Sequence, residues 1–491
     1  MKFDVVIIGA GLGGLECGYI LAKNGYKVCI LEQAPVLGGC LQTFKRRGTD
    51  FDTGFHYIGA LGEGQSLRRI FDYFNLMHLP WQELDRDCFD EVVIGEESFP
   101  FANGREQFVE RLAEYYPKEK DNLKRYIQVL KGVGDNIFNS LKPREAAEFY
   151  QSMPFTTSAK SFLEETITDP KLRMVLAGTS LKMELHPNLP LYIFAQINDS
   201  FIQSAWRIKG GGQQIADSLA KEIENMHGVV RCNAKVVELK EEDGKIRYAI
   251  LNNGEDVEGD LFISDVHPQA TLNLIKESKL IRNIYRRRIN NIPNTFGMFT
   301  ANIQLKKDSI PYLNRNQYMY KTDDIWNFHL RRNQVEGLLV SYQTPENDSQ
   351  YAHNIDLLTP MTWEEVEMWE NTRIMRRGED YENLKKKKAS ECIEIASKRI
   401  IGLKESVENL YTSTPLTYRD YTGTAYGSAY GIQKDHSNLM TTMLTPRTPV
   451  PNLLLTGQNL NLHGILGVSM TSFLTCSEIL GHKIIQKELN F

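Results

Sequence analysis

The pattern of apolar and polar residues at the start of the chain predicts a strand, a helix and a second strand. Residues 3–8 form a short run that is apolar except at Asp4 and rich in β-branched side chains, which is typical of a buried parallel strand. A helical pattern extends to about residue 24, and Gly25 stands where many helices end in a left-handed residue. Residues 27–31 are predicted to form the second strand. This order predicts a βαβ unit.

A glycine motif joins the first strand to the helix and indicates a dinucleotide site. Gly9, Gly11 and Gly14 have the spacing Gly-x-Gly-x-x-Gly, with Gly13 before the last of them. These glycines allow a tight turn, close approach of a pyrophosphate to the helix N-terminus, and close packing of helix on strand. Glu32 ends the second strand, where it would accept hydrogen bonds from an adenosine ribose. A glycine-rich turn without a nucleotide is the alternative.

Two further glycine segments favour FAD over NAD. Gly38 and Gly39 follow the second strand directly, so the chain is expected to turn back over the same cofactor. Residues 450–457 are predicted to be a strand that ends in a glycine, and residues 463–468 lead into an apolar helix whose N-terminus would also face the cofactor. Both ends of the chain would serve one long cofactor. No second Gly-x-Gly-x-x-Gly follows a strand, so we expect no separate NAD(P) domain.

The same patterns predict the elements of the rest of the chain. Residues 66–200 are expected to be mostly helical and residues 271–415 mixed. The predicted helices lie at 67–74, 104–116, 119–137, 158–165, within 209–228 after a glycine turn, over 362–401 as one or two helices, and at 469–485. The predicted strands lie at 229–239, 246–252, 260–264, 300–305, 326–330 and 337–344.

We therefore expect an α/β protein with two interleaved domains. A Rossmann-like FAD-binding domain, similar to those of amine oxidases and glutathione reductases, is predicted from residues 1–65, 201–270 and 416–491. An α+β substrate-binding domain is predicted from residues 66–200 and 271–415. The cofactor domain is thus discontinuous and is interrupted twice.

Composition bears on partners more than on the fold. The 491 residues, 42% hydrophobic and 24% charged, are ordinary for a globular protein of two or more domains. A net charge of −5 gives no reason to expect nucleic acid. Seven scattered cysteines without Cys-x-x-Cys pairs predict neither disulfides nor a metal site. Neither a signal peptide nor an apolar run of 18 residues is evident, so we expect a cytoplasmic protein, with peripheral membrane contact left open.

Two clusters of positive charge bear on membrane contact. Residues 286–288 are three arginines, and residues 385–388 are four lysines. Such clusters attract anionic lipid head groups. Leu384, Ala389 and Ile393 supply an apolar face beside the lysines. We therefore interpret each cluster as a solvated helix face.

Several motifs resemble those of the carotenoid and retinoid oxidoreductases, a flavoprotein family of phytoene desaturases, carotene isomerases and retinol saturases. The first glycine motif and Glu32 are similar to the family's FAD fingerprint, and residues 38–44 resemble its second glycine motif. Residues 51–59 most resemble the saturase branch, the retinol 13,14-reductases. The remaining segments that resemble the family are 208–213, 233–237, 414–417, 425–431 and 457–458.

Two positions depart from the common family pattern. Cys40 stands where an arginine is usual, and we expect it to be a small filler beside the pyrophosphate rather than a reactive thiol. Gln458 stands where many members have aspartate, and its amide can still hydrogen-bond to a phosphate or ribityl group. Both departures favour the saturase branch over a desaturase.

The glycine motifs and the resemblance together imply a set of FAD-binding residues. Val236 and Val237 belong to the strand whose backbone would contact adenine. The full set is Gly9, Gly11, Gly13, Gly14, Glu32, Gln33, Gly38, Gly39, Cys40, Thr43, Gly54, His56, Val236, Val237, Gly457, Gln458, Gly464, Gly467 and Val468.

The resemblance also implies hydride and proton transfer at a carbon–carbon double bond of a polyene or isoprenoid lipid, held in an apolar channel. Reduction, as in retinol 13,14-reduction, is the nearest activity. A phytoene-type desaturase and a redox-neutral carotene isomerase are alternatives, and so is a flavin- and lipid-binding protein without turnover. An amine-oxidase-like enzyme would need an aromatic-caged amine site, which the sequence does not display. The polyene and the electron donor or acceptor stay open.

Candidate acid–base groups are few. His56 and Tyr57 follow a glycine expected near the cofactor, and they are the predicted catalytic residues. A hydrogen-bonded structural histidine is the alternative for His56. His463 precedes the last helix and is expected to contact the flavin or pyrophosphate. The sequence leaves open whether Tyr426 and Tyr430 line a substrate tunnel or only pack.

Overall fold

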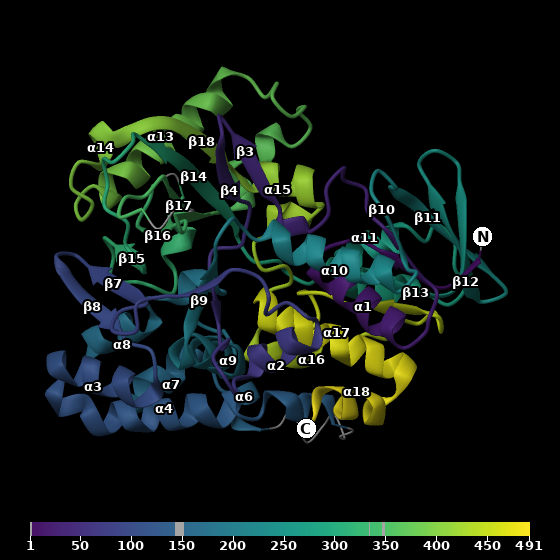
Figure 1. Ribbon diagram of the computed structural model, residues 1–491, viewed down its shortest axis with the longest axis horizontal. Coiled ribbons are helices and arrows are strands. Elements are labelled where there is room, and N and C mark those ends of the chain that lie inside the picture. The colour runs from purple at the N-terminus through teal and green to yellow at the C-terminus, as the bar shows by residue number, and fades with distance from the viewer. Residues whose placement is uncertain (1, 143–151, 333, 346–348) are drawn as a thin grey trace.

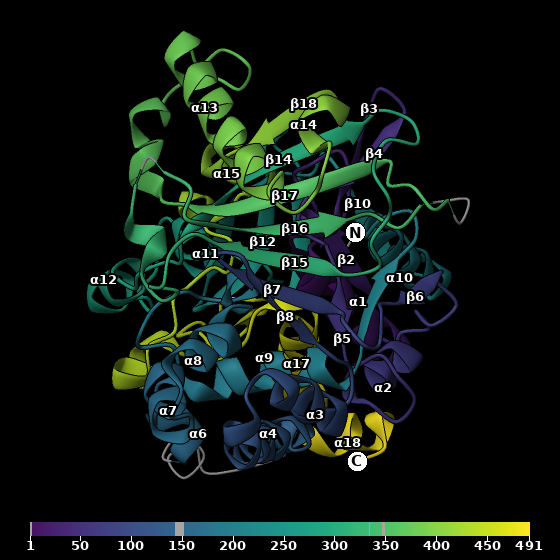
Figure 2. The same cartoon turned by 90° about the vertical axis from the view of Figure 1, so that its left-hand side faces the viewer.

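The computed structural model describes residues 2–142, 152–332, 334–345 and 349–491. Within these residues the chain builds two seven-stranded sheets and two smaller ones. The first large sheet lies at the right in Figure 1 and the second at the upper left, above a layer of helices. Figure 2 shows the same helices below the second sheet.

The first sheet carries the predicted βαβ unit. Its strands are β1 (Lys2–Ile8), β2 (Val28–Leu31), β10 (Val229–Arg231), β11 (Val236–Glu242), β12 (Lys245–Leu251), β13 (Asp256–Ser264) and β19 (Leu453–Leu455). They run in the order β10-β2-β1-β13-β12-β11, with β19 also paired to β13. The pairs between β10, β2, β1, β13 and β19 are parallel, and Ile8 lies opposite both Leu31 and Ser264. The carboxyl ends of these strands therefore meet at one edge, where open α/β sheets bind ligands.

Alternating side chains bury both faces of this sheet. Val5, Ile7 and Ile30 pack on one side with α1 (Leu12–Lys23), α10 (Gln213–Asn225) and α17 (Gly464–Leu480). Val6 and Ile8 pack on the other side. That second side is covered by residues near α11 (Pro268–Asn273) and α12 (Asn283–Asn290). The last helix, α18 (His482–Leu489), contacts α2 (Ser66–Tyr73).

The second sheet is mixed and joins distant parts of the chain. Its strands are β7 (Asp90–Ile94), β8 (Glu97–Phe101), β14 (Gly297–Leu305), β15 (Asn316–Tyr320), β16 (Gly337–Tyr342), β17 (Asn354–Met361) and β18 (Val407–Ser413). They run in the order β18-β14-β17-β16-β15-β7-β8. One face packs against α13 (Glu379–Ala396) and α14 (Leu403–Ser406). The other face packs against helices from residues 105–203.

The remaining elements connect the two sheets. The helical layer consists of α3 (Arg105–Tyr115), α4 (Lys120–Gly134), α6 (Met153–Thr156), α7 (Ala159–Thr166), α8 (Pro170–Ala177) and α9 (Leu191–Gln203). The small strands are β3 (Thr43–Arg46) with β4 (Thr49–Asp52), and β5 (Ile58–Gly59) and β6 (Trp81–Glu83) on either side of β9 (Ala205–Ile208). Two short helices, α15 (Pro415–Thr422) and α16 (Leu439–Thr442), complete the fold.

The fold class is confirmed as α/β, with a Rossmann-like unit and an interleaved mixed sheet. All strands of the first sheet fall within residues 1–65, 201–270 and 416–491, and those of the second within 66–200 and 271–415. The division into two domains stays a prediction.

Residues 66–200 are less helical than predicted. Residues 81–101 contain β6, β7 and β8, which are too short to give a strong periodic signal, and β8 carries Pro100, as an edge strand can. The sequence analysis also missed α9. Its polar residues Asn198 and Asp199 are buried like its apolar ones, so no polar stripe marks it as a helix.

Four other predicted elements differ from the structure. The predicted strand at 229–239 is interrupted between β10 and β11, where Asn233 has φ of 54°. The predicted strand at 326–330 contains a 3₁₀ helix, Phe328–Leu330. Within 362–401, two 3₁₀ turns precede α13. The helix predicted at 469–485 starts five residues earlier, as α17, and breaks at Gly481, which has φ of 86°. Across the described residues, no helix is long and apolar enough to cross a membrane.

Candidate functional site

The turn after β1 has the geometry that its glycines predict. Gly9 has φ of 97°, a backbone region in which glycine is unstrained. A Cβ at Gly14 would lie 2.1 Å from the carbonyl oxygen of Gly9, so α1 packs this closely against the turn only with glycine there. The N–H of Gly38 donates to the carbonyl of Ala10 at 2.8 Å. The second glycine segment therefore lies directly against the first.

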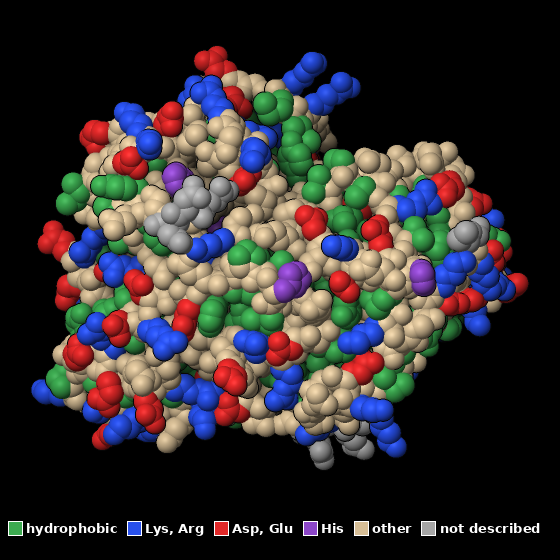
Figure 3. Space-filling model, in the orientation of Figure 1, with side chains coloured by type: hydrophobic (Ala, Val, Ile, Leu, Met, Phe, Trp, Pro, Cys, Tyr) green, Lys and Arg blue, Asp and Glu red, His purple; other side chains and the backbone are tan. Residues whose placement is uncertain are grey.

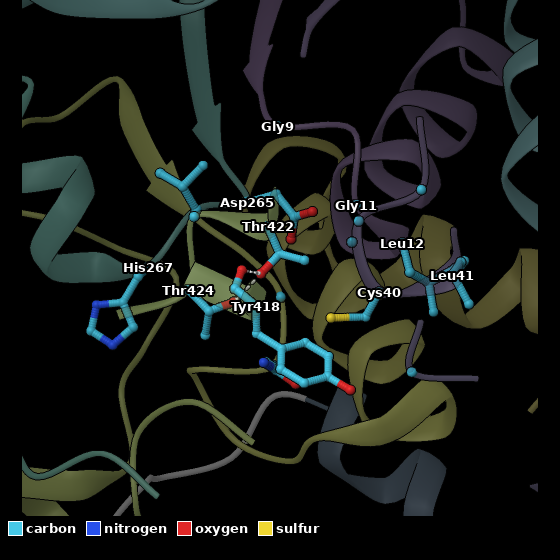
Figure 4. A pocket seen from close by; sticks show the side chains of 18 of the residues that line it. Gly9, Gly11, Leu12, Cys40, Leu41, Asp265, His267, Tyr418, Thr422 and Thr424 are labelled. Atoms are coloured by element: carbon cyan, nitrogen blue, oxygen red, sulfur yellow. Dashed lines mark hydrogen bonds between the residues drawn. The ribbon is translucent and has the colours of Figure 1, made fainter. Parts of the chain in front are cut away.

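A cavity of about 500 Å³ begins at this turn. Its walls come from the glycine turn, residues 38–42 and 53–56, the loop after β13, the region of α15, the loop after β19 and the start of α17 (Figure 4). It will be called the nucleotide cavity. The predicted residues that line it are Gly9, Gly11, Gly13, Glu32, Gln33, Gly38, Gly39, Cys40, Gly54, His56, Val236, Gly457, Gln458, Gly464 and Val468.

Four residues of the predicted FAD set lie outside this lining. Gly14 supports the turn from behind, and Gly467 lines a second cavity instead. The hydroxyl of Thr43 donates to Asp52 Oδ1 at 2.7 Å. Val237 is 39% exposed at the surface. A part for Thr43 and Val237 in cofactor binding stays a prediction.

The carboxylate of Glu32 is fixed in the cavity wall. Its Oε2 accepts from the N–H of Ala10 at 2.9 Å, and its Oε1 accepts from the N–H of Ala34 at 2.8 Å. Each oxygen keeps a further lone pair. The side chain is thus oriented to accept a hydrogen bond from a ribose hydroxyl without rearrangement.

Three residues that the sequence analysis did not single out also line the nucleotide cavity: Asp265, His267 and Tyr418 (Figure 4). Burial, with a smaller contribution from Glu32, raises the pKa of the Asp265 carboxyl to about 7. His267 Nε2 is hydrogen-bonded to Asn294 Oδ1 at 2.8 Å. A sequence signal for Asp265 existed, because it directly follows a parallel strand next to β1.

A second cavity of about 170 Å³ adjoins the first and will be called the chamber. Its lining is mainly apolar and includes Phe55, Ile58, Leu67, Leu181, Ile197, Phe201, Met298, Leu339, Leu358, Leu462, Ile465 and Leu466. The two cavities share Gly54, Phe55, His56, Met298, Leu358, Tyr430, Gly464 and Ile465. A ligand in the nucleotide cavity would therefore have one end at the wall of an apolar space.

The predicted catalytic residues lie at this shared wall and in the chamber. His56 Nε2 is buried and has no hydrogen-bond partner among the described residues. Burial lowers the pKa of His56 to about 4, so its ring is neutral near pH 7. The Tyr57 hydroxyl lies 2.8 Å from Asp90 Oδ2 and 2.5 Å from the Tyr318 hydroxyl. Tyr57 is therefore held in place, whereas His56 Nε2 is free to meet a ligand.

A lysine missed by the sequence analysis extends this polar cluster. Lys182 lines the chamber, and its Nζ lies 3.4 Å from Asp90 Oδ2 and 4.3 Å from the ring centre of Phe201. Burial lowers the pKa of Lys182 to about 8, although Asp90 partly offsets this. A positive charge thus lies in the wall of a mainly apolar chamber.

His463 lines the chamber rather than the nucleotide cavity. Its Nε2 has no hydrogen-bond partner among the described residues, and its Nδ1 lies 3.9 Å from Glu184 Oε1. Its ring centre is 4.7 Å from that of Tyr430. Burial lowers the pKa of His463 to about 4. The contact of His463 with the flavin or pyrophosphate stays a prediction.

The two tyrosines that the sequence left undecided differ. Tyr430 lines both cavities, and its hydroxyl donates to the carbonyl of Leu181 at 2.6 Å. Tyr426 is 47% exposed and packs on the ring of Trp363.

Cys40 lines the nucleotide cavity, and burial raises the pKa of its thiol to about 11. A thiol that stays protonated fits a filler rather than a nucleophile.

The basic clusters are partly engaged in the fold, so the interpretation as solvated helix faces is wrong for two residues. Lys388 is 3% exposed and bonds to Glu365 at 2.6 Å. Arg286 donates to the carbonyls of Leu272 and Ile275, both at 2.6 Å.

Elsewhere the side chains of Met368 and Met375 are exposed, by 75% and 92%. Figure 3 shows hydrophobic side chains beside lysines or arginines at the top projection.

Residues 7–74 match the family model described as an NAD(P)-binding Rossmann-like domain. All-trans-retinol 13,14-reductase from Danio rerio is 27% identical, over 99% of this chain and 87% of that protein. A 4,4'-diapophytoene desaturase from Methylomonas is 25% identical, over 56% of each chain. A putrescine oxidase variant shares the fold, with a TM-score of 0.67, 16% identity and coverage of 98% and 99%.

The fold, the nucleotide cavity and these relatives define the chain as an oxidoreductase with a Rossmann-like dinucleotide-binding unit. Within that class, the similarity to the carotenoid and retinoid oxidoreductases that the motifs predicted is confirmed over nearly the whole chain.

Proposed function

We propose that this oxidoreductase binds FAD and reduces a carbon–carbon double bond of a polyene or isoprenoid lipid, as the names of its retinol 13,14-reductase relatives suggest. The observation that carries the proposal is the shared wall between the nucleotide cavity and the apolar chamber. A dinucleotide whose reactive ring reached that wall would meet a substrate that prefers an apolar site.

The residues of the nucleotide cavity fit FAD. The glycine turn would hold the pyrophosphate, Glu32 the adenosine ribose, and the loop around Gln458 the ribityl chain. The ring would lie near His56 and Tyr430, where the orphaned Nε2 of His56 offers a hydrogen bond. We also assign residues 1–65, 201–270 and 416–491 to the FAD-binding domain, and 66–200 and 271–415 to the substrate-binding domain.

Bound FAD, once reduced by an external two-electron donor, would supply the hydride. The chain's own contribution is to exclude water with the chamber's apolar lining and to provide a proton at the shared wall. His56 Nε2 lies at this wall without a hydrogen-bond partner among the described residues, and because its ring is neutral near pH 7, it would first take a proton from solvent and then pass it to the substrate. Tyr57, fixed by Asp90 and Tyr318, would orient the substrate and reinforce the wall.

The test combines cofactor analysis with product mass. Purified protein should release about one FAD per chain on acid precipitation. After anaerobic photoreduction of the bound flavin, polyene alcohols and carotenes are added, and the masses of the lipid products are measured by mass spectrometry. Reduction adds two hydrogens to the polyene. A product of unchanged mass would favour the isomerase alternative, and a loss of two hydrogens by the oxidised enzyme would favour the desaturase.

Two outcomes would contradict the proposal. A folded protein that binds no flavin would remove its basis. A flavoprotein whose reduced form is reoxidised by none of the polyenes, although it carries extracted lipid, would favour the binding protein without turnover. Peripheral membrane contact stays a prediction, to be checked by flotation with anionic vesicles.

A further inference from the structure

Asp265 lies at the centre of the glycine turn. It follows the last residue of β13, and its N–H donates to the carbonyl of Ile8 at 2.8 Å. Figure 4 shows its carboxyl beside Gly11, facing the cavity. The N–H of Gly14, in the first turn of α1, donates to this carboxyl. An acidic side chain therefore stands where an anion would meet the helix N-terminus.

The glycines keep open the space that this carboxyl fills. A Cβ at Gly11 would lie 2.6 Å from Asp265 Oδ2. A Cβ at Gly13 or at Gly457 would lie 2.5 Å from Asp265 Oδ1. The space that the glycines leave open for a pyrophosphate is therefore also occupied in part by the Asp265 carboxyl.

The surroundings of Asp265 add negative rather than positive charge. Glu32, at the end of β2, repels its charged form. Glu16 on α1 lies behind it, bonded to Ser469 at 2.6 Å, and burial raises the pKa of Glu16 to about 8. Cys40 faces it as a thiol, and His267, whose pKa burial lowers, is two residues away. Among the described residues of the cavity lining, Lys235 is the one lysine or arginine, and it is not among the charges that act on Asp265.

We propose that Asp265 binds the pyrophosphate of the dinucleotide as a neutral acid, donating a hydrogen bond to a phosphate oxygen, so that binding takes up one proton. This inference rests on the proposed dinucleotide, but the flavin itself is not needed for it. A charged carboxylate in contact with a diphosphate, without a neighbouring cation, would be strongly repelled. The neutral acid instead becomes a donor.

The sign of the pH dependence follows from linkage. Burial, and to a smaller extent Glu32, raises the pKa of free Asp265 to about 7, against the lowering effect of the hydrogen bond from Gly14, and an adjacent diphosphate raises it further. Affinity is therefore greatest below pH 7 and falls as pH rises above it. The dissociation constant should grow about tenfold per pH unit between pH 7 and the pKa reached in the complex.

The experiment measures binding, not turnover. Cofactor-free full-length protein is titrated with FAD, ADP-ribose and AMP from pH 6 to 8.5, by flavin fluorescence and by calorimetry. Calorimetry in buffers of different ionisation enthalpy counts the protons. At pH 8 we expect uptake near one proton for FAD and for ADP-ribose, and about fivefold weaker binding than at pH 7. AMP, which lacks the diphosphate, should take up little.

Asp265→Asn keeps the shape and a donor but cannot ionise, so it should bind equally well at pH 6 and pH 8 without proton uptake. Asp356→Asn is the matched control. Asp356 is 1% exposed, burial raises its pKa to about 7, and it lines neither cavity. This control should keep the wild-type pH dependence.

Each outcome decides a different point. Tight, pH-independent binding of FAD by the wild-type protein would overturn the inference and leave the proposed cofactor standing. Binding of ADP-ribose with proton uptake, but not of FAD, would support the inference and overturn the proposed function. If Asp265→Asn does not fold, proton counting on the wild-type protein still decides. A folded wild-type protein that binds neither ligand would overturn both.

Discussion

The nucleotide cavity and the chamber share a wall but are built differently. The nucleotide cavity begins at glycine turns at the carboxyl ends of parallel strands, and its lining includes nine glycines. The chamber is formed by side chains from α9, β16, β17 and the start of α17. Backbone recognition depends on local geometry, which a short motif specifies. A chamber of side chains depends on tertiary packing, so its chemistry changes while the fold stays the same.

Because of this difference, a single added apolar side chain at the glycine turn should have the largest effect on cofactor binding. In Gly11→Val the new side chain would meet Asp265 Oδ2, so we expect at least a hundredfold loss of FAD affinity. Gly132→Ala is the control, because a Cβ there meets nothing within 4 Å and lies inside α4. It should stabilise the fold by up to about 1 kcal/mol and leave affinity unchanged. Near-native FAD binding by Gly11→Val would refute backbone recognition.

The second prediction separates chemistry from binding at the shared wall. His56→Gln removes the proposed proton carrier, so turnover of the reduced flavin by a polyene should fall about a hundredfold. FAD affinity should change less than threefold, because Gln retains a hydrogen-bonding group. Rapid-reaction spectroscopy measures flavin reoxidation directly. An unchanged reoxidation rate would assign His56 the structural part that the sequence left open.

A smaller effect is expected at Tyr57. Tyr57→Phe removes a hydroxyl and leaves Asp90 and Tyr318 each without one partner. The free energy of unfolding should fall by about 1–3 kcal/mol, which denaturant titration measures. Turnover should fall less than in His56→Gln. A larger loss of turnover than in His56→Gln would move the proton route to Tyr57.

The smallest effect distinguishes two tyrosines. Tyr430→Phe removes a hydroxyl bonded to the carbonyl of Leu181 at the shared wall, and should change KM or kcat severalfold. Tyr426→Phe, at the surface, should match the wild type within error. Equal effects from the two variants would mean that the shared wall does not shape the substrate site.

The same contrast explains what the sequence could predict. The βαβ unit, the glycine turn and Glu32 were predictable because spacing along one short segment sets their geometry. Asp265 could also have been predicted, since it directly follows a predicted strand. Lys182 and Glu184 lie on a stretch without regular periodicity and face partners more than 90 residues away. Only the tertiary structure brings such residues together.

The order of synthesis sets when the site can exist. β1 and the glycine turn are made first, β13 and Asp265 near the middle, and Gly457 and α17 among the last residues. The Tyr73 hydroxyl donates to Glu488 at 2.5 Å, so the final helix also ties back to the start of the chain. A nascent chain still short of these segments has the glycine turn but no closed cavity. The complete cavity can therefore bind a cofactor only after these late segments have been synthesised and packed.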